Sequence, residues 1–162
     1  MTNTDLIIIG SGPGGYELAA NAAKAGLSVV LCEKDQLGGT CLNRGCIPTK
    51  ALCRNAEILS HVKEAQTYGV ESPSCAADFS KAMERKNQVV AQLQEGIKML
   101  LSNPNITIAQ GVASMKDAHT VVVNEVEYSA KNIVIATGSA PAMLPIPGVD
   151  LPGVITSDEM LS

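Results

Sequence analysis

Short apolar runs alternate with alanine-rich helical stretches at the start of the chain. Residues 5–9 form an apolar run of strand length, which leads directly into a glycine-rich turn. Residues 16–26 are rich in alanine and close with glycine, which predicts a helix, and residues 28–33 predict a second strand. Apolar runs of this length are typical of parallel strands that are buried on both faces. The pattern therefore indicates an α/β fold with a parallel sheet and flanking helices.

Two long helical patterns occupy the middle of the chain. Residues 51–68 predict one helix, and residues 69–78, which include Pro73, predict an irregular segment. A second helix is predicted at residues 79–102 and is stopped by Asn103-Pro104-Asn105. Its apolar residues recur at roughly helical spacing and predict a face that packs in the core or at a subunit interface. These residues are Phe79, Ala82, Met83, Val90, Leu93, Ile97, Leu100 and Leu101.

The last third of the chain contains further strand candidates. Short strands separated by turns are predicted at residues 106–109, 120–123 and 125–128, which suggests a small antiparallel β-meander. Residues 133–136 predict another buried strand, which ends in Thr137-Gly138-Ser139. Because ligands bind beyond the carboxyl ends of strands in open α/β sheets, this turn should lie beside the first glycine-rich turn.

The chain changes character after this strand. From Pro141 onward prolines and glycines are frequent, as in a linker, and residues 156–159 look like the start of a helix. We therefore expect one domain at residues 1–145, followed at residues 146–162 by a linker and the beginning of a further domain.

The glycine-rich turn matches a nucleotide-binding motif. Residues 10–15 read Gly-Ser-Gly-Pro-Gly-Gly, which fits G-x-G-x-x-G between a strand and a helix. In this motif Gly10 permits a tight turn, Gly12 lets the backbone approach a pyrophosphate, and Gly15 allows close packing of helix on strand. Glu33 ends the second strand 18 residues after Gly15, where an acidic residue can bind a ribose hydroxyl. The combination predicts a Rossmann-like dinucleotide site; the alternative is a tight turn with an ordinary solvated glutamate.

Two cysteines five positions apart, Cys41 and Cys46, lie in the stretch at residues 38–50. Five residues of regular α-helix rise about 7.5 Å, beyond the roughly 6.8 Å that a disulfide spans between Cα atoms. A redox-active pair therefore needs an irregular backbone, which Gly45 can supply. Pro48 then suits the first turn of a helix, so we expect Cys46 near a helix N-terminus and the thiol of lower pKa.

Composition excludes several classes of function. With 162 residues, of which 46% are hydrophobic and 2% aromatic, the chain can form one core built from Ala, Val, Ile and Leu. A net charge of −4 offers no basic surface for nucleic acid or membranes. The longest apolar runs are far shorter than the roughly 18 residues that span a bilayer, and no signal peptide is evident. We therefore expect a cytoplasmic protein without nucleic-acid or membrane partners.

The chain has five cysteines, an odd number, which favours one reactive pair over a disulfide framework. A metal site from Cys32, Cys53 and Cys75 is an alternative, but there is no Cys-x-x-Cys and the two histidines add no zinc-like spacing. We expect no metal. Cys32 and Cys53 are interpreted as small core residues and Cys75 as an exposed thiol.

Taken in order, these motifs resemble the flavoprotein disulfide reductases over the whole chain. The resemblance rests on Gly10-x-Gly12-x-x-Gly15, Glu33, Gly39-Thr40-Cys41 through Cys46-Ile47-Pro48-Thr49-Lys50, and Ala136-Thr137-Gly138. The segment Leu42-Asn43-Arg44-Gly45 resembles the corresponding segment in the branch of the family that acts on dihydrolipoamide. A glutathione- or mercuric-reductase-type enzyme is the alternative, for which Val-Asn-Val-Gly would be expected.

The resemblance implies that the cofactor is FAD. Glu33 would hold the adenosine ribose, Ala113 would make a backbone contact near the adenine, and Lys50 would sit by the reactive part of the flavin. The full set of residues that the resemblance assigns to FAD is Gly10, Gly12, Pro13, Gly14, Gly15, Glu33, Lys34, Gly39, Thr40, Cys41, Lys50, Gly111, Ala113, Ala136, Thr137 and Gly138.

The resemblance also implies a reaction, with Cys41, Cys46 and Lys50 as catalytic residues. A dihydrolipoamide thiolate, carried by the acyltransferase of a 2-oxoacid dehydrogenase or glycine cleavage complex, would attack Cys41. Cys46 would leave as the thiolate beside the flavin, and the reducing equivalents would pass through FAD to NAD. A homodimer is the expected assembly of the full-length enzyme.

Some family features are missing from the sequence. There is no second nucleotide fingerprint for NAD and no C-terminal interface domain. The family's catalytic base is a histidine with a glutamate five residues later, whereas His61 and His119 are followed at that offset by Gln66 and Asn124. We interpret both as surface histidines. The chain is therefore expected to be a truncated FAD domain, inactive alone; a non-catalytic FAD-binding fragment is the alternative.

Overall fold

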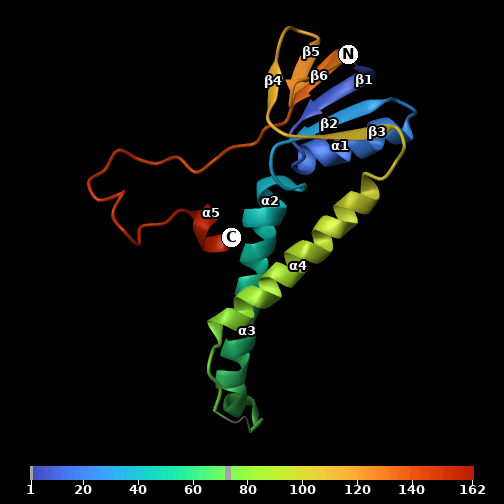
Figure 1. Cartoon of the computed structure of the whole chain (residues 1–162). Helices are drawn as coiled ribbons and strands as arrows, with labels where there is room; N and C mark the ends of the chain where they lie inside the picture. Colours follow the sequence, from blue (N-terminus) through green and yellow to red (C-terminus); the bar gives the residue numbers. More distant parts are fainter. Residues whose placement is uncertain (1, 72–73) are drawn as a thin grey trace.

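The computed structural model describes residues 2–71 and 74–162, and its strands form one six-stranded sheet in the order β3-β2-β1-β6-β5-β4 (Figure 1). The strands are β1 (Thr2–Ile9), β2 (Val29–Glu33), β3 (Ile106–Gln110), β4 (Ala113–Met115), β5 (Thr120–Val123) and β6 (Val126–Ile135). The helices are α1 (Pro13–Lys24), α2 (Gly39–Arg44), α3 (Cys46–Glu64), the short 3₁₀ helix η1 (Ala65–Tyr68), α4 (Phe79–Leu100) and α5 (Ser157–Leu161). The predicted α/β class is confirmed.

The four strands β3, β2, β1 and β6 are parallel, so their carboxyl ends meet at one edge of the sheet. In β1, Ile7 and Ile8 are both fully buried, one in each of two apolar clusters. Because successive side chains of a strand point to opposite faces, this shows that β1 is covered on both sides, as its apolar run predicted. Helix α1 covers one face closely because Ala19 and Ala22 present small side chains to the cluster of Ile8.

The prediction of an antiparallel meander at residues 106–128 is wrong for the first of its strands. The strand at residues 106–109 is β3, which pairs in parallel with β2, from Ile106 beside Val29 to Gln110 beside Glu33. A parallel partner needs a crossover connection, and α2 to α4 supply it between β2 and β3. The antiparallel part of the sheet consists of β4, β5 and β6.

The strands predicted at residues 125–128 and 133–136 are one continuous strand, β6. The polar residues Ser129, Lys131 and Asn132 interrupt its apolar pattern, which led to the division. The backbone continues because β6 pairs with β5 at residues 126–129 and with β1 from Tyr128 to Ile135, so ladder hydrogen bonds carry it through the polar stretch.

Helices α3 and α4 project away from the sheet as a pair (Figure 1). The apolar face predicted for α4 is therefore only partly core: Ile97 and the adjoining Leu101 are buried, while Phe79 is 59% exposed. Cys53 of α3 is exposed, so its interpretation as a core residue was wrong. The reason is that α3 packs on α4 along one side only, beyond the reach of the sheet.

The predicted irregular segment after α3 is present in the described part of residues 69–78, while Pro73 lies outside the described residues. Residues 136–155 contain neither helix nor strand, and the chain returns to place α5 beside α2 (Figure 1). The predicted helix start is confirmed, with a capping box between Thr156 and Glu159. The predicted domain boundary after residue 145 falls within the irregular stretch and stays a prediction.

Within residues 2–71 and 74–162, none of the helices combines the length and hydropathy that a bilayer crossing requires.

A candidate dinucleotide and dithiol site

The glycine loop between β1 and α1 has a backbone that side chains would not permit. Gly10 has φ +101°, and a Cβ at this position would lie 2.3 Å from the carbonyl oxygen of Ala136. A Cβ on Gly15 would lie 1.9 Å from the carbonyl oxygen of Gly10. Both distances are far below van der Waals contact. Gly10 therefore makes the tight turn, and Gly15 makes the close helix–strand packing, that the motif predicted.

The same loop leaves open space where a phosphate would bind. A Cβ on Gly12 would meet its nearest atom at 4.0 Å, and one on Gly14 would meet nothing within 4 Å. Gly12 is the N-cap of α1, no side chain caps this terminus, and Pro13 starts the helix. The backbone N–H of Gly14 and the positive end of the helix dipole thus face the space in which an anion could bind.

Glu33, at the end of β2, is 8% exposed and is held by the glycine loop. Its Oε2 accepts hydrogen bonds from the backbone N–H of Ser11 at 2.9 Å and from the Ser11 hydroxyl at 2.6 Å. Its Oε1 accepts from the backbone N–H of Asp35 at 2.9 Å. Each carboxylate oxygen can accept further bonds, so the group is oriented by the chain and retains acceptor capacity for a ribose hydroxyl.

Sequence reasoning missed Ser11, which is fully buried and joins both halves of the site. Besides holding Glu33, its carbonyl accepts a hydrogen bond from the backbone N–H of Gly38 at 3.0 Å. A Cβ on Gly39 would lie 2.6 Å from Cα of Gly12, so the two backbones touch. The start of α2, and with it the cysteine stretch, is therefore fixed directly against the nucleotide loop.

The cysteine stretch consists of two helices that meet at Gly45, as the spacing of the cysteines required. Gly45 has φ −137° and ψ −113°, which ends α2 and lets α3 begin at Cys46. The backbone N–H and the hydroxyl of Thr49 both donate to the carbonyl of Gly45, at 3.1 and 2.7 Å. Pro48 is buried in the first turn of α3, where its missing N–H leaves no bond unmade.

This break brings Cys46 close enough to Cys41 to affect the pKa of the Cys41 thiol. The pKa of the Cys41 thiol is raised above its ordinary value, chiefly by the hydrogen bond with Cys46 and next by partial burial. The charge of Lys50 acts in the opposite direction on the same pKa. Cys41 is half-buried and Cys46 is exposed. Both are free thiols.

The carboxyl ends of β1, β2 and β6 and the starts of α1 and α2 enclose a cavity of about 680 Å³. Most residues that the sequence assigned to FAD line it: Gly10, Gly12, Pro13, Gly14, Glu33, Lys34, Gly39, Thr40, Cys41, Gly111, Ala113, Ala136, Thr137 and Gly138. Gly15 lies buried behind the loop, and Cys46 and Lys50 are exposed beyond the lining.

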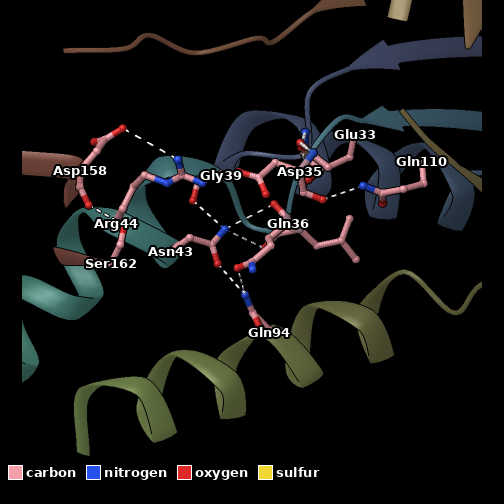
Figure 2. Close-up of polar contacts among 12 residues, drawn as sticks. Glu33, Asp35, Gln36, Gly39, Asn43, Arg44, Gln94, Gln110, Asp158 and Ser162 are labelled. Carbon is pink, nitrogen blue, oxygen red and sulfur yellow. Dashed lines mark hydrogen bonds and ion pairs between the residues drawn. The ribbon is translucent and has the colours of Figure 1, made fainter. Parts of the chain in front are cut away.

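A polar network that the sequence analysis did not foresee forms the rim of this cavity (Figure 2). Arg44 pairs with Asp35, which follows β2, and its Nη1 lies 3.9 Å from Oδ2 of Asp158 in α5. The side-chain amide of Asn43 donates to the carbonyls of Leu37 and Gly39, at 3.1 and 3.0 Å. Asn43 and Arg44 lie between Cys41 and Cys46 in the sequence. Their polar character was the only local feature that could have predicted the network.

The residues present fit FAD at two places. The first is the phosphate cradle, because the space in front of Gly12 and Gly14 is open and α1 presents an uncapped N-terminus to it. The second is the ribose position, because Glu33 is a buried, oriented carboxylate at the end of β2. The cofactor role of each lining residue stays a prediction.

The two histidines lie on the surface, as expected. His61 is exposed on α3, and His119 is exposed before β5 with its Nδ1 3.1 Å from the carbonyl oxygen of Ala130. Neither lines the cavity formed by the described residues. The same part of the chain, residues 2–71 and 74–162, holds no cluster of three or more potential metal ligands.

A nucleotide cradle and Cys41, one cysteine of the predicted pair, line one cavity, which fits the class of dinucleotide-binding thiol oxidoreductases. Comparison of the sequence with known families narrows this class. The chain belongs to the family described as pyridine nucleotide-disulphide oxidoreductase, whose model matches residues 4–161. The resemblance to flavoprotein disulfide reductases is thereby confirmed.

Individual relatives cover nearly the whole chain. A dihydrolipoyl dehydrogenase of Acholeplasma laidlawii is 42% identical over 98% of the chain, and one of Bacillus subtilis is 41% identical over 97%. Among solved structures, the Cu(II) complex of the HOCl-induced flavoprotein disulfide reductase RclA from Escherichia coli superposes with a TM-score of 0.80 at 36% identity, over 99% of the chain. The chain spans 48%, 36% and 34% of these three proteins.

Proposed function

We propose that the chain is the FAD-binding, dithiol-carrying part of a disulfide oxidoreductase. One observation carries the proposal: Cys41, which neighbours Cys46 across the helix break at Gly45, lines the same cavity as the uncapped N-terminus of α1. Nucleotide binding and thiol chemistry thus take place in one space. FAD bound there would accept the two electrons of the Cys41–Cys46 dithiol.

Different residues of the chain have different roles in this function. The first turn of α1 binds the pyrophosphate, and Glu33, oriented by Ser11, binds the ribose. Gly45 keeps Cys41 and Cys46 within bonding distance, so that the pair can exist as dithiol or disulfide. Lys50, one turn beyond Cys46, carries a charge that acts on the Cys41 thiol.

The Cys41–Cys46 disulfide exchanges with a dithiol substrate in two steps. One substrate thiolate attacks the Cys41 sulfur of the disulfide, the Cys41–Cys46 bond breaks, and Cys46 leaves as a thiolate. The second substrate thiol then displaces Cys41, so the substrate becomes a disulfide and the pair becomes a dithiol. Two electrons and two protons move from substrate to protein.

We propose dihydrolipoamide as the substrate and NAD as the final acceptor. The support is that relatives more than 40% identical are named dihydrolipoyl dehydrogenases. The partner would then be the lipoyl-bearing acyltransferase of a 2-oxoacid dehydrogenase or glycine cleavage complex, and the full-length assembly a homodimer. A reducing compartment such as the cytoplasm suits a cysteine pair that cycles.

Thiol counting tests the redox pair. After oxidation and denaturation, we expect two of the five cysteines to resist alkylation until a reductant is added. Cys41→Ser and Cys46→Ser should each abolish this difference, because each removes one end of the disulfide. Cys53→Ser, an exposed cysteine on the same helix as Cys46, is the matched control and should keep it. A redox-dependent difference that survives in Cys41→Ser would refute the pair.

A second candidate function is that of an FAD-binding part of an enzyme that catalyses no reaction by itself. It is favoured by the exposed positions of His61 and His119, which leave the cavity without the predicted type of base. Equilibrium dialysis with FAD and an NADH–lipoamide assay on the 162-residue chain separate the two candidates. FAD binding without turnover supports the second, and turnover rules it out.

A further inference from the structure

The C-terminal helix α5 returns to the site from far along the chain. Residues 136–155 lead away from the sheet, and α5 then packs beside α2, next to the cavity (Figure 1). Helix α5 has only five residues, too few to be stable without contacts. What fixes its position therefore lies in the elements around it.

Lys86 of α4 provides one such contact. Its side chain is 1% exposed, which makes it the largest fully buried side chain among the described residues. Its Nζ donates a hydrogen bond of 2.8 Å to the carbonyl oxygen of Leu161, 75 positions later in the chain. Burial lowers the pKa of this amine, because the protein interior solvates the charge poorly. A buried lysine is rarely kept without a partner, and here the partner is the end of α5.

A second contact reaches the cavity itself. Asp158, in the first turn of α5, lines the cavity together with Arg44 and Asp35. Arg44 lies between the two carboxylates, paired with Asp35 and 3.9 Å from Asp158 (Figure 2). The capping box orients the start of the helix, with Glu159 accepting from the backbone N–H of Thr156 at 2.6 Å. If α5 moved, Asp158 would leave the cavity wall.

We propose that Lys86 is a positioning residue: by holding the carbonyl of Leu161, it fixes α5 so that Asp158, through Arg44 and Asp35, closes one side of the cofactor cavity. The inference rests on the proposed function, because it takes FAD as the occupant of the cavity. Lys86 itself does not line the cavity; it lies in an adjoining pocket on the other side of Asn43 and Arg44. Its effect on FAD is indirect and should show as faster release of the cofactor.

The substitution Lys86→Met tests this role. Methionine has similar length and is apolar, so the rest of the fold should keep its unfolding midpoint, since replacing a buried charge by an apolar group is often neutral. Loss of a charge-assisted hydrogen bond should release α5, with amide exchange in residues 156–162 at least tenfold faster and FAD dissociation about tenfold faster. Lys98→Met, in the same helix but exposed, is the control and should change neither rate.

The substitution Asp158→Asn provides a second test of the proposal, and it does not require the removal of a buried group. It should speed FAD dissociation while leaving amide exchange in the sheet unchanged. The double variant should dissociate FAD no faster than Lys86→Met alone, because Lys86 acts on the cavity only by positioning Asp158. Independent, multiplicative effects would overturn the proposed coupling.

The outcomes separate this inference from the proposed function. If the unsubstituted protein binds no FAD, the proposed function fails, whatever Lys86 does to α5. If it binds FAD, unchanged exchange of residues 156–162 in Lys86→Met overturns the inference alone. Released α5 with an unchanged FAD dissociation rate would show that Lys86 anchors the helix without shaping the cavity, and would also overturn it.

Discussion

The cysteines show how surroundings decide the chemistry of one residue type. Cys32, in β2, is 1% exposed, and burial raises the pKa of its thiol to about 11. Cys53 and Cys75 are exposed, while Cys41 lines the cavity and is half-buried. Reactivity needs both the thiolate and access to it, so Cys32 is inert, and Cys41 and Cys46 are the pair that we propose as redox-active.

The buried thiol of Cys32 predicts a loss of stability at alkaline pH. Its folded-state pKa of about 11 lies above the ordinary 9.0, so its contribution is fully present below pH 9. Above pH 9 the unfolded thiol ionises while the folded one does not, and the free energy of unfolding should fall by about 2 kcal/mol by pH 10.5.

Urea unfolding at pH 8 and pH 10.5, with reductant present, measures this change. Cys32→Ala should show a smaller fall between the two pH values, because it removes the titrating group. In Cys75→Ala, which removes an exposed thiol, the free energy of unfolding should fall by as much as in the unsubstituted protein. Equal falls in all three proteins would contradict the assignment to Cys32.

At the scale of elements, the break between α2 and α3 is what makes the dithiol possible. A continuous helix would hold Cys41 and Cys46 too far apart for a disulfide. A Cβ on Gly45 would lie 2.9 Å from the carbonyl oxygen of Thr40 and 3.1 Å from Cα of Cys41. Both neighbours are backbone atoms, so the break cannot accept a side chain without moving one helix.

Gly45→Ala should therefore destabilise the protein by about 1–3 kcal/mol and slow disulfide formation, because relief of the clash separates the cysteines. Gly96→Ala, inside α4 with nothing within 4 Å of the added Cβ, should stabilise by about 0.5–1 kcal/mol and leave oxidation unchanged. Urea unfolding and the rate of thiol loss under a mild oxidant measure both effects. Oxidation of Gly45→Ala at the unsubstituted rate would show that the break is not needed.

At the scale of the whole molecule, the cavity exists because segments far apart in the chain touch through backbone atoms. Gly10 meets Ala136 at the ends of β1 and β6, and Gly12 meets Gly39 where α1 and α2 begin. Ser11 bonds to both Glu33 and Gly38. A change at any of these contacts shifts two walls of the cavity together.

Gly15→Ala tests this dependence on close packing. Its Cβ would lie 1.9 Å from the carbonyl oxygen of Gly10, so α1 must move away from β1. We expect a loss of about 3 kcal/mol or more and loss of FAD binding. Gly14→Ala, the adjacent position with nothing within 4 Å, should keep its stability. Equal unfolding midpoints for the two variants, measured with urea, would contradict the packing argument.

Local signals were enough for the parts of the fold and site that depend on neighbours in sequence. Residue type and spacing were enough to predict the tight turn at Gly10, the close packing at Gly15 and the helix break at Gly45. They also placed Pro48 in the first turn of a helix and Glu33 at the end of β2. The buried part of β1 and the strand β2 followed from uninterrupted apolar runs, whereas residues 2–4, which extend β1 by pairing with β6, were not predicted. In each case the physical constraint acts within a few residues.

Tertiary structure alone decided what depends on partners far away in the chain. The pairing of β3 with β2, the continuity of β6 and the exposure of Cys53 depend on which elements come together. So do the contacts of Arg44 with Asp158 and of Lys86 with Leu161. The sequence determined a nucleotide loop and a dithiol, but only the fold placed them at one cavity, because hydrogen bonds and packing between distant segments leave no local pattern.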